Sequence, residues 1–156
     1  MTIPYVTATG KVIELRVRQL GKEPKYMPVN RDFPLPTDKF HLFNAQQAMP
    51  TSRRRTVYIC EGELDAVLCV ANGYKAVAVP GAGQWQRQWN FLFSEAEVRI
   101  VFDGDEAGRK GAENLASRLA QDRIEVTVLD IPDGMDISDV YIQHGPDALH
   151  RLLTQA

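Results

Sequence analysis

The sequence has no run of apolar residues long enough to cross a lipid bilayer, which requires about 20 in succession. Its amino terminus, MTIPYVTATGK, does not combine a charged leader with an apolar segment, the pattern of a secretory signal. Cysteine is scarce, since Cys60 and Cys69 are the only two in 156 residues, and this does not indicate a disulfide scaffold. We therefore expect a protein of the cytoplasm.

Several motifs that would indicate a cofactor or a nucleophile are also missing. Gly81 and Gly83 form a Gly-x-Gly pattern after an apolar run, but the third glycine and the downstream acid of a dinucleotide site are absent. The segment around Lys110 lacks the glycine spacing and the following Ser or Thr of a P-loop. The three histidines share no spacing, and no Cys/His cluster resembles a zinc site. The chemistry must therefore come from other residues.

Charge is divided unevenly along the chain, although the net charge is only −2. Residues 1–60 contain ten Lys or Arg against four Asp or Glu, whereas residues 61–156 contain eight against sixteen. A basic part could contact the phosphates of a nucleic acid, and an acidic part could collect cations. Ordinary solvated surfaces would give the same numbers, so composition alone leaves both interpretations open.

From residue 56 onward, short apolar runs alternate with helical patterns. We predict strands where the runs are rich in Val and Ile, over 56–60, 75–80, 97–102 and 124–130. We predict helices where apolar residues recur at helical spacing, over 63–73, 86–96, 106–122, 138–144 and 146–154. This alternation predicts an α/β domain over 56–156, with a four-stranded, mainly parallel sheet flanked by helices.

Residues 1–55 have a different character, because prolines break them into short pieces. Residues 11–20 alternate, which predicts a half-exposed strand with Arg16 and Arg18 on its solvent side. We predict a small, basic, partly β subdomain over 1–55, connected to the following domain through TSRRRT (51–56). The three arginines of this junction fit two interpretations, a phosphate contact and a solvated linker.

Carboxylates follow three of the four predicted strands at the point where each strand ends. Glu61 follows the first strand, with Asp65 one helical turn later, and Asp103 and Asp105 follow the third. The fourth strand is followed by Asp130, Asp133, Asp136 and Asp139. The carboxyl ends of parallel strands meet at one edge of a sheet. Carboxylates gathered there repel one another unless a cation lies among them, and oxygen ligands suit Mg²⁺ or Mn²⁺.

The Asp-Gly-Asp segment at 103–105 also has a purely structural interpretation. Asp103 and Gly104 are typical of a turn, and Asp105 is a good N-cap for the helix predicted to begin near Glu106. The two interpretations are compatible, because Gly104 and Asp105 can form the turn while Asp103 and Asp105 hold a cation.

Three segments resemble the acidic motifs of the toprim domain, which DnaG-type primases, topoisomerases and several nucleases share. They are CEGELDA (60–66), FDGDEAGRKGAENLA (102–116) and DGMDISDVYIQHG (133–145). The resemblance implies a compact, Rossmann-like α/β domain in which Glu61, Asp103 and Asp105 are catalytic. It also implies that these three residues and Asp136 hold Mg²⁺ or Mn²⁺.

Asp65 and Asp139 are additional acids in this comparison. Asp65 matches the acid that accompanies the first glutamate in primases, and Asp136 and Asp139 fall where primases have a third acidic pair. Bacterial primases separate that pair by one residue, whereas two residues separate Asp136 and Asp139 here. The role implied for Asp139 therefore rests on a weaker match than that of Asp136.

The resemblance extends upstream of the acidic motifs. GKVIELRVRQLGKEPKYM (10–27) and LFNAQQA (42–48) resemble the primase polymerase subdomain, and VPGAGQW (79–85) resembles a loop of phage and mobile-element primases. By this resemblance Arg16, Arg18 and Lys25 would hold template or nucleotide phosphates. Arg109 and Lys110 lie beside the carboxylates in the first turn of a predicted helix, which suggests a similar contact with nucleic acid or NTP.

The resemblance implies metal-dependent nucleotidyl transfer, the synthesis of short RNA primers on single-stranded DNA by the catalytic core of a DnaG-type primase. Two alternatives stay open, a metal-dependent toprim nuclease and a non-catalytic nucleic-acid-binding module. The implied partners are single-stranded DNA template and NTPs, together with a replicative helicase or a separate zinc-binding module, and no membrane. A phage-encoded protein of this kind would act in the host cytoplasm.

Overall fold

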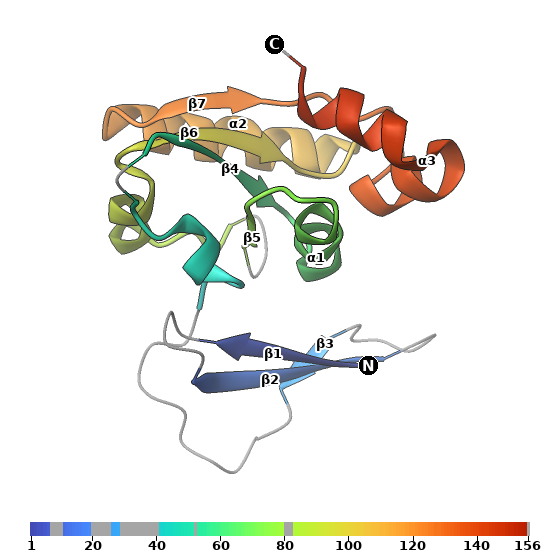
Figure 1. Cartoon of the computed structure of the whole chain (residues 1–156), viewed down its shortest axis with the longest axis horizontal. Coiled ribbons are helices and arrows are strands. Elements are labelled where there is room, and N and C mark those ends of the chain that lie inside the picture. The colour runs from blue at the N-terminus through green and yellow to red at the C-terminus, as the bar shows by residue number, and fades with distance from the viewer. Residues whose placement is uncertain (7–10, 20–25, 29–40, 52, 80–82, 156) are drawn as a thin grey trace.

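The structure, a computed structural model, describes residues 1–6, 11–19, 26–28, 41–51, 53–79 and 83–155. Two sheets are present in these residues (Figure 1). The first is antiparallel in the order β1-β2-β3, with β1 at Thr2–Val6, β2 at Val12–Arg18 and β3 at Tyr26–Pro28. The second is parallel in the order β5-β4-β6-β7, with β4 at Arg55–Cys60, β5 at Ala76–Ala78, β6 at Ala96–Val101 and β7 at Glu125–Val128.

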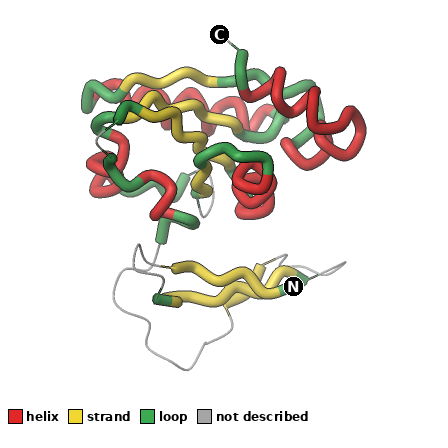
Figure 2. The backbone as a smooth tube through the Cα atoms, viewed as in Figure 1, coloured by secondary structure: helices red, strands yellow, loops and turns green. Residues whose placement is uncertain are grey.

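Helices flank the four-stranded sheet, as Figure 2 shows. The α-helices are α1 at Glu63–Ala71, α2 at Glu106–Gln121 and α3 at Ile137–Leu153, and the short 3₁₀-helices are η1 at Ala45–Ala48 and η2 at Arg87–Phe93. The predicted α/β class and its four-stranded parallel sheet are confirmed, and the predicted strands agree with the observed ones to within two residues at each end.

Strands β4, β5 and β6 are largely buried on both faces, which explains why they are mainly apolar, whereas the edge strand β7 is mostly exposed. Successive residues of β4 alternate between two cores: Val57 and Ile59 pack with α2 and η2, whereas Tyr58 and Cys60 pack with α1 and α3. Each core buries a stripe of one long helix, such as Leu115 and Leu119 of α2. The result is a three-layer arrangement that fixes the two ends of every strand.

Two of the helices differ in detail from the ranges predicted from the sequence. The segment predicted as a helix over 86–96 forms the 3₁₀-helix η2, in which Trp89, Asn90, Leu92 and Phe93 are all buried, so its burial does not follow one α-helical face. The two closing helices occur as one element, α3, interrupted at Gly145, whose φ of 79° is not helical. Pro146 follows at this break, in agreement with the predicted boundary.

The three-stranded sheet packs against the four-stranded unit, below it in Figure 1. Ile3 and Tyr5 of β1 join the core that contains α1 and α3, and the Tyr5 ring meets Phe43 edge-on at 5.2 Å between centroids. The prediction that Arg16 lies on the solvent side of β2 is wrong. Glu14 and Arg16 face inward with only 7% and 16% of their side chains exposed, because both enter a polar junction with α1.

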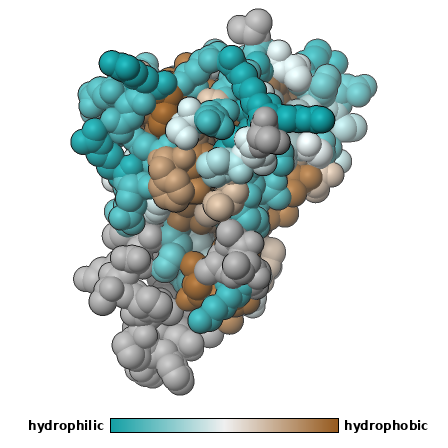
Figure 3. Space-filling view, turned by 60° about the vertical axis from the view of Figure 1, so that its left-hand side comes forward, coloured by the Kyte–Doolittle hydropathy of each residue, from teal (hydrophilic) through white to brown (hydrophobic). Residues whose placement is uncertain are grey.

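The surface is mainly polar. On the face shown in Figure 3, hydrophobic side chains occupy small separate areas among hydrophilic ones. The most exposed large hydrophobic residues are Ile142 of α3 and Phe91 of η2, and scattered side chains of this kind are normal on a protein surface. Within the described residues, no helix combines the length and the apolar character needed to cross a membrane.

Candidate metal centre

The first and second acidic segments meet at the carboxyl edge of the four-stranded sheet. Strands β4 and β6 are parallel neighbours, and their last residues, Cys60 and Val101, are paired in register. Glu61 directly follows β4, and Asp103 follows β6 after Phe102. The backbone N–H of Asp103 donates a hydrogen bond of 3.4 Å to Oε2 of Glu61. The strand register therefore brings together two of the predicted catalytic residues.

Gly104 lets the segment that leads to Asp136 approach this edge. The N–H of Gly104 donates to the carbonyl of Met135 at 2.8 Å, and the N–H of Gly134 donates to the carbonyl of Gly104 at 2.9 Å. A Cβ atom on Gly104 would lie 2.2 Å from the carbonyl oxygen of Pro132, closer than such atoms can approach. A glycine is therefore required here if residues 131–136 are to lie against the Asp-Gly-Asp turn.

Asp65 connects α1 to the same edge. Its side chain is buried and accepts a hydrogen bond of 2.8 Å from the hydroxyl of Ser138 in α3. Burial raises the pKa of Asp65 to about 6, with a further contribution from the charge of Asp136, while Ser138 and Arg18 act in the opposite direction. The charge of Asp136, at the start of α3, therefore affects the ionisation of Asp65 in α1.

The effect of the acidic cluster is clearest in the raised pKa of Asp103. Burial raises its pKa to about 7, and the charges of Glu61, Asp65, Asp136 and Asp105 add to this effect in that order. The pKa of Glu61 is also raised, first by burial and then by Asp105, although the Asp103 N–H partly offsets this shift. All three acidic segments therefore act electrostatically on one carboxylate, as their positions after successive strands predicted.

Asp105, Asp136 and Asp139 also have structural roles. Asp105 is the N-cap of α2, and its Oδ1 accepts the N–H of Gly108 at 2.6 Å. Asp136 is the N-cap of α3 and forms a capping box with Asp139, in which each carboxylate accepts the other residue's N–H at 2.7 and 3.3 Å. The capping role predicted for Asp105 is confirmed, and each cap fixes the position of a carboxylate at this edge.

The donor chemistry of the edge fits a divalent cation. In the part of the chain that the structure describes, no three Asp, Glu, His or Cys side chains are close enough together to hold a metal ion. The crowded groups are nevertheless all carboxylates, and their mutual repulsion adds to the effect of burial in raising the pKa of Asp103. A hard cation would relieve this repulsion, and oxygen ligands are those that Mg²⁺ and Mn²⁺ prefer.

The predicted basic residues lie in different surroundings. Arg109 is exposed at the start of α2 and forms an ion pair of 2.8 Å with Asp133, and Lys110 beside it is also exposed. Arg16 contacts Glu14 at 2.8 Å and Glu63 at 3.2 Å in the junction between the sheets. Arg18 is partly buried on β2, near enough to Asp65 to affect its pKa. Lys25 lies outside the described residues.

Glu63 is a central residue that the sequence analysis did not identify. It is 4% exposed, and its Oε1 accepts a hydrogen bond of 2.6 Å from the Tyr5 hydroxyl in addition to the Arg16 contact. These bonds connect the three-stranded sheet to the first turn of α1, directly beside Glu61. Its place in the Glu-Gly-Glu segment was a usable signal, but nothing in the sequence pattern indicated Tyr5 as its partner.

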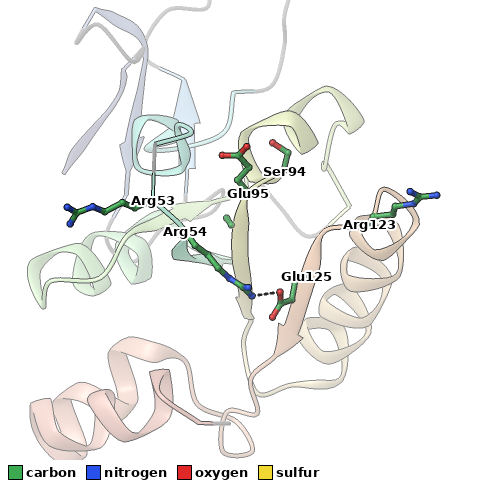
Figure 4. A pocket seen from close by; sticks show the side chains of 7 residues that line it. Arg53, Arg54, Ser94, Glu95, Arg123 and Glu125 are labelled. Atoms are coloured by element: carbon green, nitrogen blue, oxygen red, sulfur yellow. Dashed lines mark hydrogen bonds and ion pairs between the residues drawn. The ribbon is translucent and has the colours of Figure 1, made fainter.

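The arginines of the TSRRRT junction are partly explained by a cavity of about 370 Å³ at the opposite, amino edge of the sheet. Figure 4 shows Arg54 directed toward Glu125, with which it forms an ion pair, whereas Arg53 and Arg123 point away from it on opposite sides. Arg55 is buried and donates to the carbonyls of Ala48 and Leu92 at 2.7 and 2.9 Å. Two of the three junction arginines therefore have structural partners.

Comparison with known proteins identifies relatives along the whole chain. The family model described as Toprim-like matches residues 58–141. "Gene 57 protein" of Mycobacterium phage D29 is 34% identical over 96% of this chain and 94% of its own length. DNA primase of Aquifex aeolicus is 28% identical over 100% of this chain, which spans only 32% of that primase.

Solved structures give the same relationship. The zinc-binding and RNA polymerase domains of the Aquifex aeolicus primase align with a TM-score of 0.78 and 26% identity over 97% of this chain and 39% of that one. A DnaG primase catalytic domain bound to single-stranded DNA aligns with a TM-score of 0.72 and 29% identity over 99% of this chain and 52% of that one. The matched part of this chain contains the acidic edge described above, and the chain belongs to the Toprim-like family.

Proposed function

We propose that the chain forms part of the catalytic core of a primase, which makes short RNA primers on single-stranded DNA by metal-dependent nucleotidyl transfer. The observation that carries the proposal is the convergence of three acidic segments on Asp103, where burial first and the neighbouring charges second raise the pKa to about 7. The similarity to DNA primases over the full chain supports the reaction class. Because the chain spans about a third of the Aquifex primase, its similarity to that protein does not assign the activity of the whole primase to this chain.

We propose Glu61, Asp103, Asp105 and Asp136 as the ligands of a divalent cation, with Asp65 and Asp139 as neighbouring acids. A bound Mg²⁺ or Mn²⁺ would stabilise the charge that develops on the attacking and leaving oxygens of phosphoryl transfer. The N-cap bonds of Asp105 and Asp136 orient these two carboxylates before any ligand arrives. Glu61, held by the Asp103 N–H, is placed to bind the cation or to accept a proton from a primer hydroxyl.

The basic residues would hold the nucleic acid and the triphosphate. Lys110 is exposed on α2 near the acidic edge and is placed to contact phosphate. Arg16 would act mainly by fixing the junction with Glu63, and Arg18 and Lys25 are the proposed template contacts of the amino-terminal part. We propose residues 1–55 as a basic subdomain and residues 56–156 as the toprim domain, a division supported by a family match that begins at residue 58.

The reaction is tested with the full chain, a single-stranded DNA template, labelled NTPs and Mg²⁺ or Mn²⁺. We expect template-dependent oligoribonucleotides that Asp103→Ala abolishes. Glu113→Gln is the matched control, because it removes an exposed carboxylate of α2 that lies eight residues beyond the N-cap Asp105, and it should leave synthesis unchanged. Strand cleavage without synthesis would contradict the proposal in favour of a nuclease. Retention of the strand without any reaction would favour a binding module.

A further inference from the structure

A cavity of about 290 Å³ lies along α2, and the mechanism above does not use it as a whole. The helix contributes most of its described lining, and Gly83 and Trp85 contribute the rest; the helical residues are Ala107, Lys110, Gly111, Asn114, Leu115 and Arg118. Lys110, Asn114 and Arg118 are spaced by four residues and therefore follow one another along one side of the helix. At 1.5 Å per residue, the side from Lys110 to Arg118 extends about 12 Å along the axis.

The charges of this side distinguish it from the rest of α2. None of the described residues that line the cavity is acidic. Within the described part of the chain, neither Lys110 nor Arg118 has an ion pair or a side-chain hydrogen bond. Two cations on either side are paired, since Arg109 contacts Asp133 at 2.8 Å and Arg87 contacts Asp122 at 2.7 Å. The cavity therefore presents two cations that form no ion pair with any carboxylate of the described residues.

Trp85 forms an apolar part of the cavity wall and is held in place by its neighbours. Trp85 is buried, its ring meets Trp89 at 5.4 Å and Phe93 at 5.5 Å, and its Nε1 donates to Asn90 at 2.8 Å. The indole is therefore packed in the core, and its N–H already has a hydrogen-bond partner. It does not present a free face on which a base could stack. Ala107 and Gly111 are small residues of the helical wall, which lets an extended chain approach the helix closely.

The position of the cavity connects it to the acidic edge. Asp105, one of the proposed metal ligands, is the N-cap of α2, so Lys110 lies about 7.5 Å from it along the helix axis. Asn114 and Arg118 continue in the same direction, away from that edge. We propose that this groove, lined by Lys110, Asn114 and Arg118, binds the sugar–phosphate backbone of single-stranded DNA as it runs to or from the acidic edge. The inference rests on the proposed function, because it assigns a path to the strand on which that function acts.

Backbone contacts of this kind have a defined dependence on salt. The logarithm of the association constant falls linearly as the logarithm of the salt concentration rises. On single-stranded DNA, each phosphate that the protein neutralises makes this slope steeper by about 0.7. Loss of two contacts should therefore reduce the slope by about 1.4, which corresponds to about 25-fold weaker binding at 0.1 M salt. The loss should not depend on the base sequence, since the groove holds no group assigned to base recognition.

The test is fluorescence anisotropy of a labelled oligothymidylate with the full chain, in EDTA and without NTPs. Lys110→Gln/Arg118→Gln should show the reduced slope and affinity, and Lys110→Arg/Arg118→Lys should bind as the unchanged protein does. The matched control is Arg53→Gln/Arg123→Gln, which removes two exposed cations at the opposite edge of the sheet and should have little effect. Circular dichroism and thermal unfolding verify that each variant is folded.

An unchanged salt slope in Lys110→Gln/Arg118→Gln would overturn the inference, as would an equal loss in the control or no binding by the unchanged protein at low salt. Because the measurement needs neither metal nor NTP, it separates the groove from the proposed function. Binding through α2 without primer synthesis would contradict the proposed function alone. Primer synthesis together with unchanged strand affinity in the double variant would contradict the groove alone.

Discussion

Removing the charge of Asp103 should stabilise the metal-free protein at neutral and alkaline pH. Burial and four neighbouring carboxylates raise the pKa of Asp103 from 3.8 to about 7, so its ionised form is disfavoured in the folded state. At about 1.36 kcal/mol for each pH unit, the full difference would correspond to about 4 kcal/mol. Because solvent reaches part of this side chain and screens it, we expect about 2 kcal/mol.

The direction of the pH dependence follows from proton binding. Between pH 4 and 7 the folded protein holds a proton on Asp103 that the unfolded chain has already released. The free energy of unfolding therefore falls as the pH rises through this range and does not recover above it. The pKa of Asp65, raised to about 6, adds to the same trend. Asp103→Asn should remove most of the decline and leave the smaller part due to Asp65.

Thermal or urea unfolding from pH 4 to 8, with and without Mg²⁺ or Mn²⁺, measures these effects. At pH 8 without metal, Asp103→Asn should raise the Tm by about 4–8 °C, the shift expected for about 2 kcal/mol in a chain of this size. Added metal should stabilise the unchanged protein and not the variant. Glu113→Gln, which removes an exposed carboxylate from α2, should alter neither the pH dependence nor the metal effect. If Asp103→Asn and the unchanged protein lose stability equally between pH 4 and 7, the reasoning is refuted.

Two further predictions concern the contacts around the acidic edge. Gly104→Ala should lower the free energy of unfolding by about 3 kcal/mol, because its Cβ would lie 2.2 Å from the Pro132 carbonyl oxygen. Gly83→Ala should cost almost nothing in the same urea titration, because its Cβ would meet no atom within 4 Å; equal costs would contradict the close-approach argument. Tyr5→Phe should cost about 1–2 kcal/mol by removing the 2.6 Å hydrogen bond to buried Glu63. A urea midpoint unchanged in Tyr5→Phe would show that this bond does not hold the two sheets together.

The sequence predicted the four-stranded sheet well because its signal is local and repeated. Strands β4, β5 and β6 are short, mainly apolar runs that lie largely buried, whereas the edge strand β7 is mostly exposed and includes polar residues. The strand order β5-β4-β6-β7 places the first and second acidic segments after adjacent strands, and the second joins the third through Gly104. The convergence of carboxylates could therefore be predicted from the rule that parallel strands present their carboxyl ends at one edge.

The amino-terminal sheet could not be predicted to the same depth. Alternation in β2 identified a strand, but it could not show which face of the strand would meet the rest of the protein. Polar residues usually mark the solvent side, and here Glu14 and Arg16 face inward because Arg16 donates to both Glu14 and Glu63, while Tyr5 donates a further hydrogen bond to Glu63. Glu63 lies 47 residues after Arg16 and 58 residues after Tyr5, so no local pattern carries the information.

The acidic edge shows why capping and metal binding favour the same residues. A helix N-terminus needs an acceptor that is fixed close to the end of the preceding strand, and a metal site needs a carboxylate fixed at that same place. Asp105 and Asp136 satisfy the first need through bonds of 2.6 and 2.7 Å to backbone N–H groups. Asp103, in contrast, caps no helix, and burial together with the surrounding charges raises its pKa. Of the acids at this edge, Asp103 is therefore the one whose placement is least explained by folding, and replacing it separates the chemistry of the site from its structure.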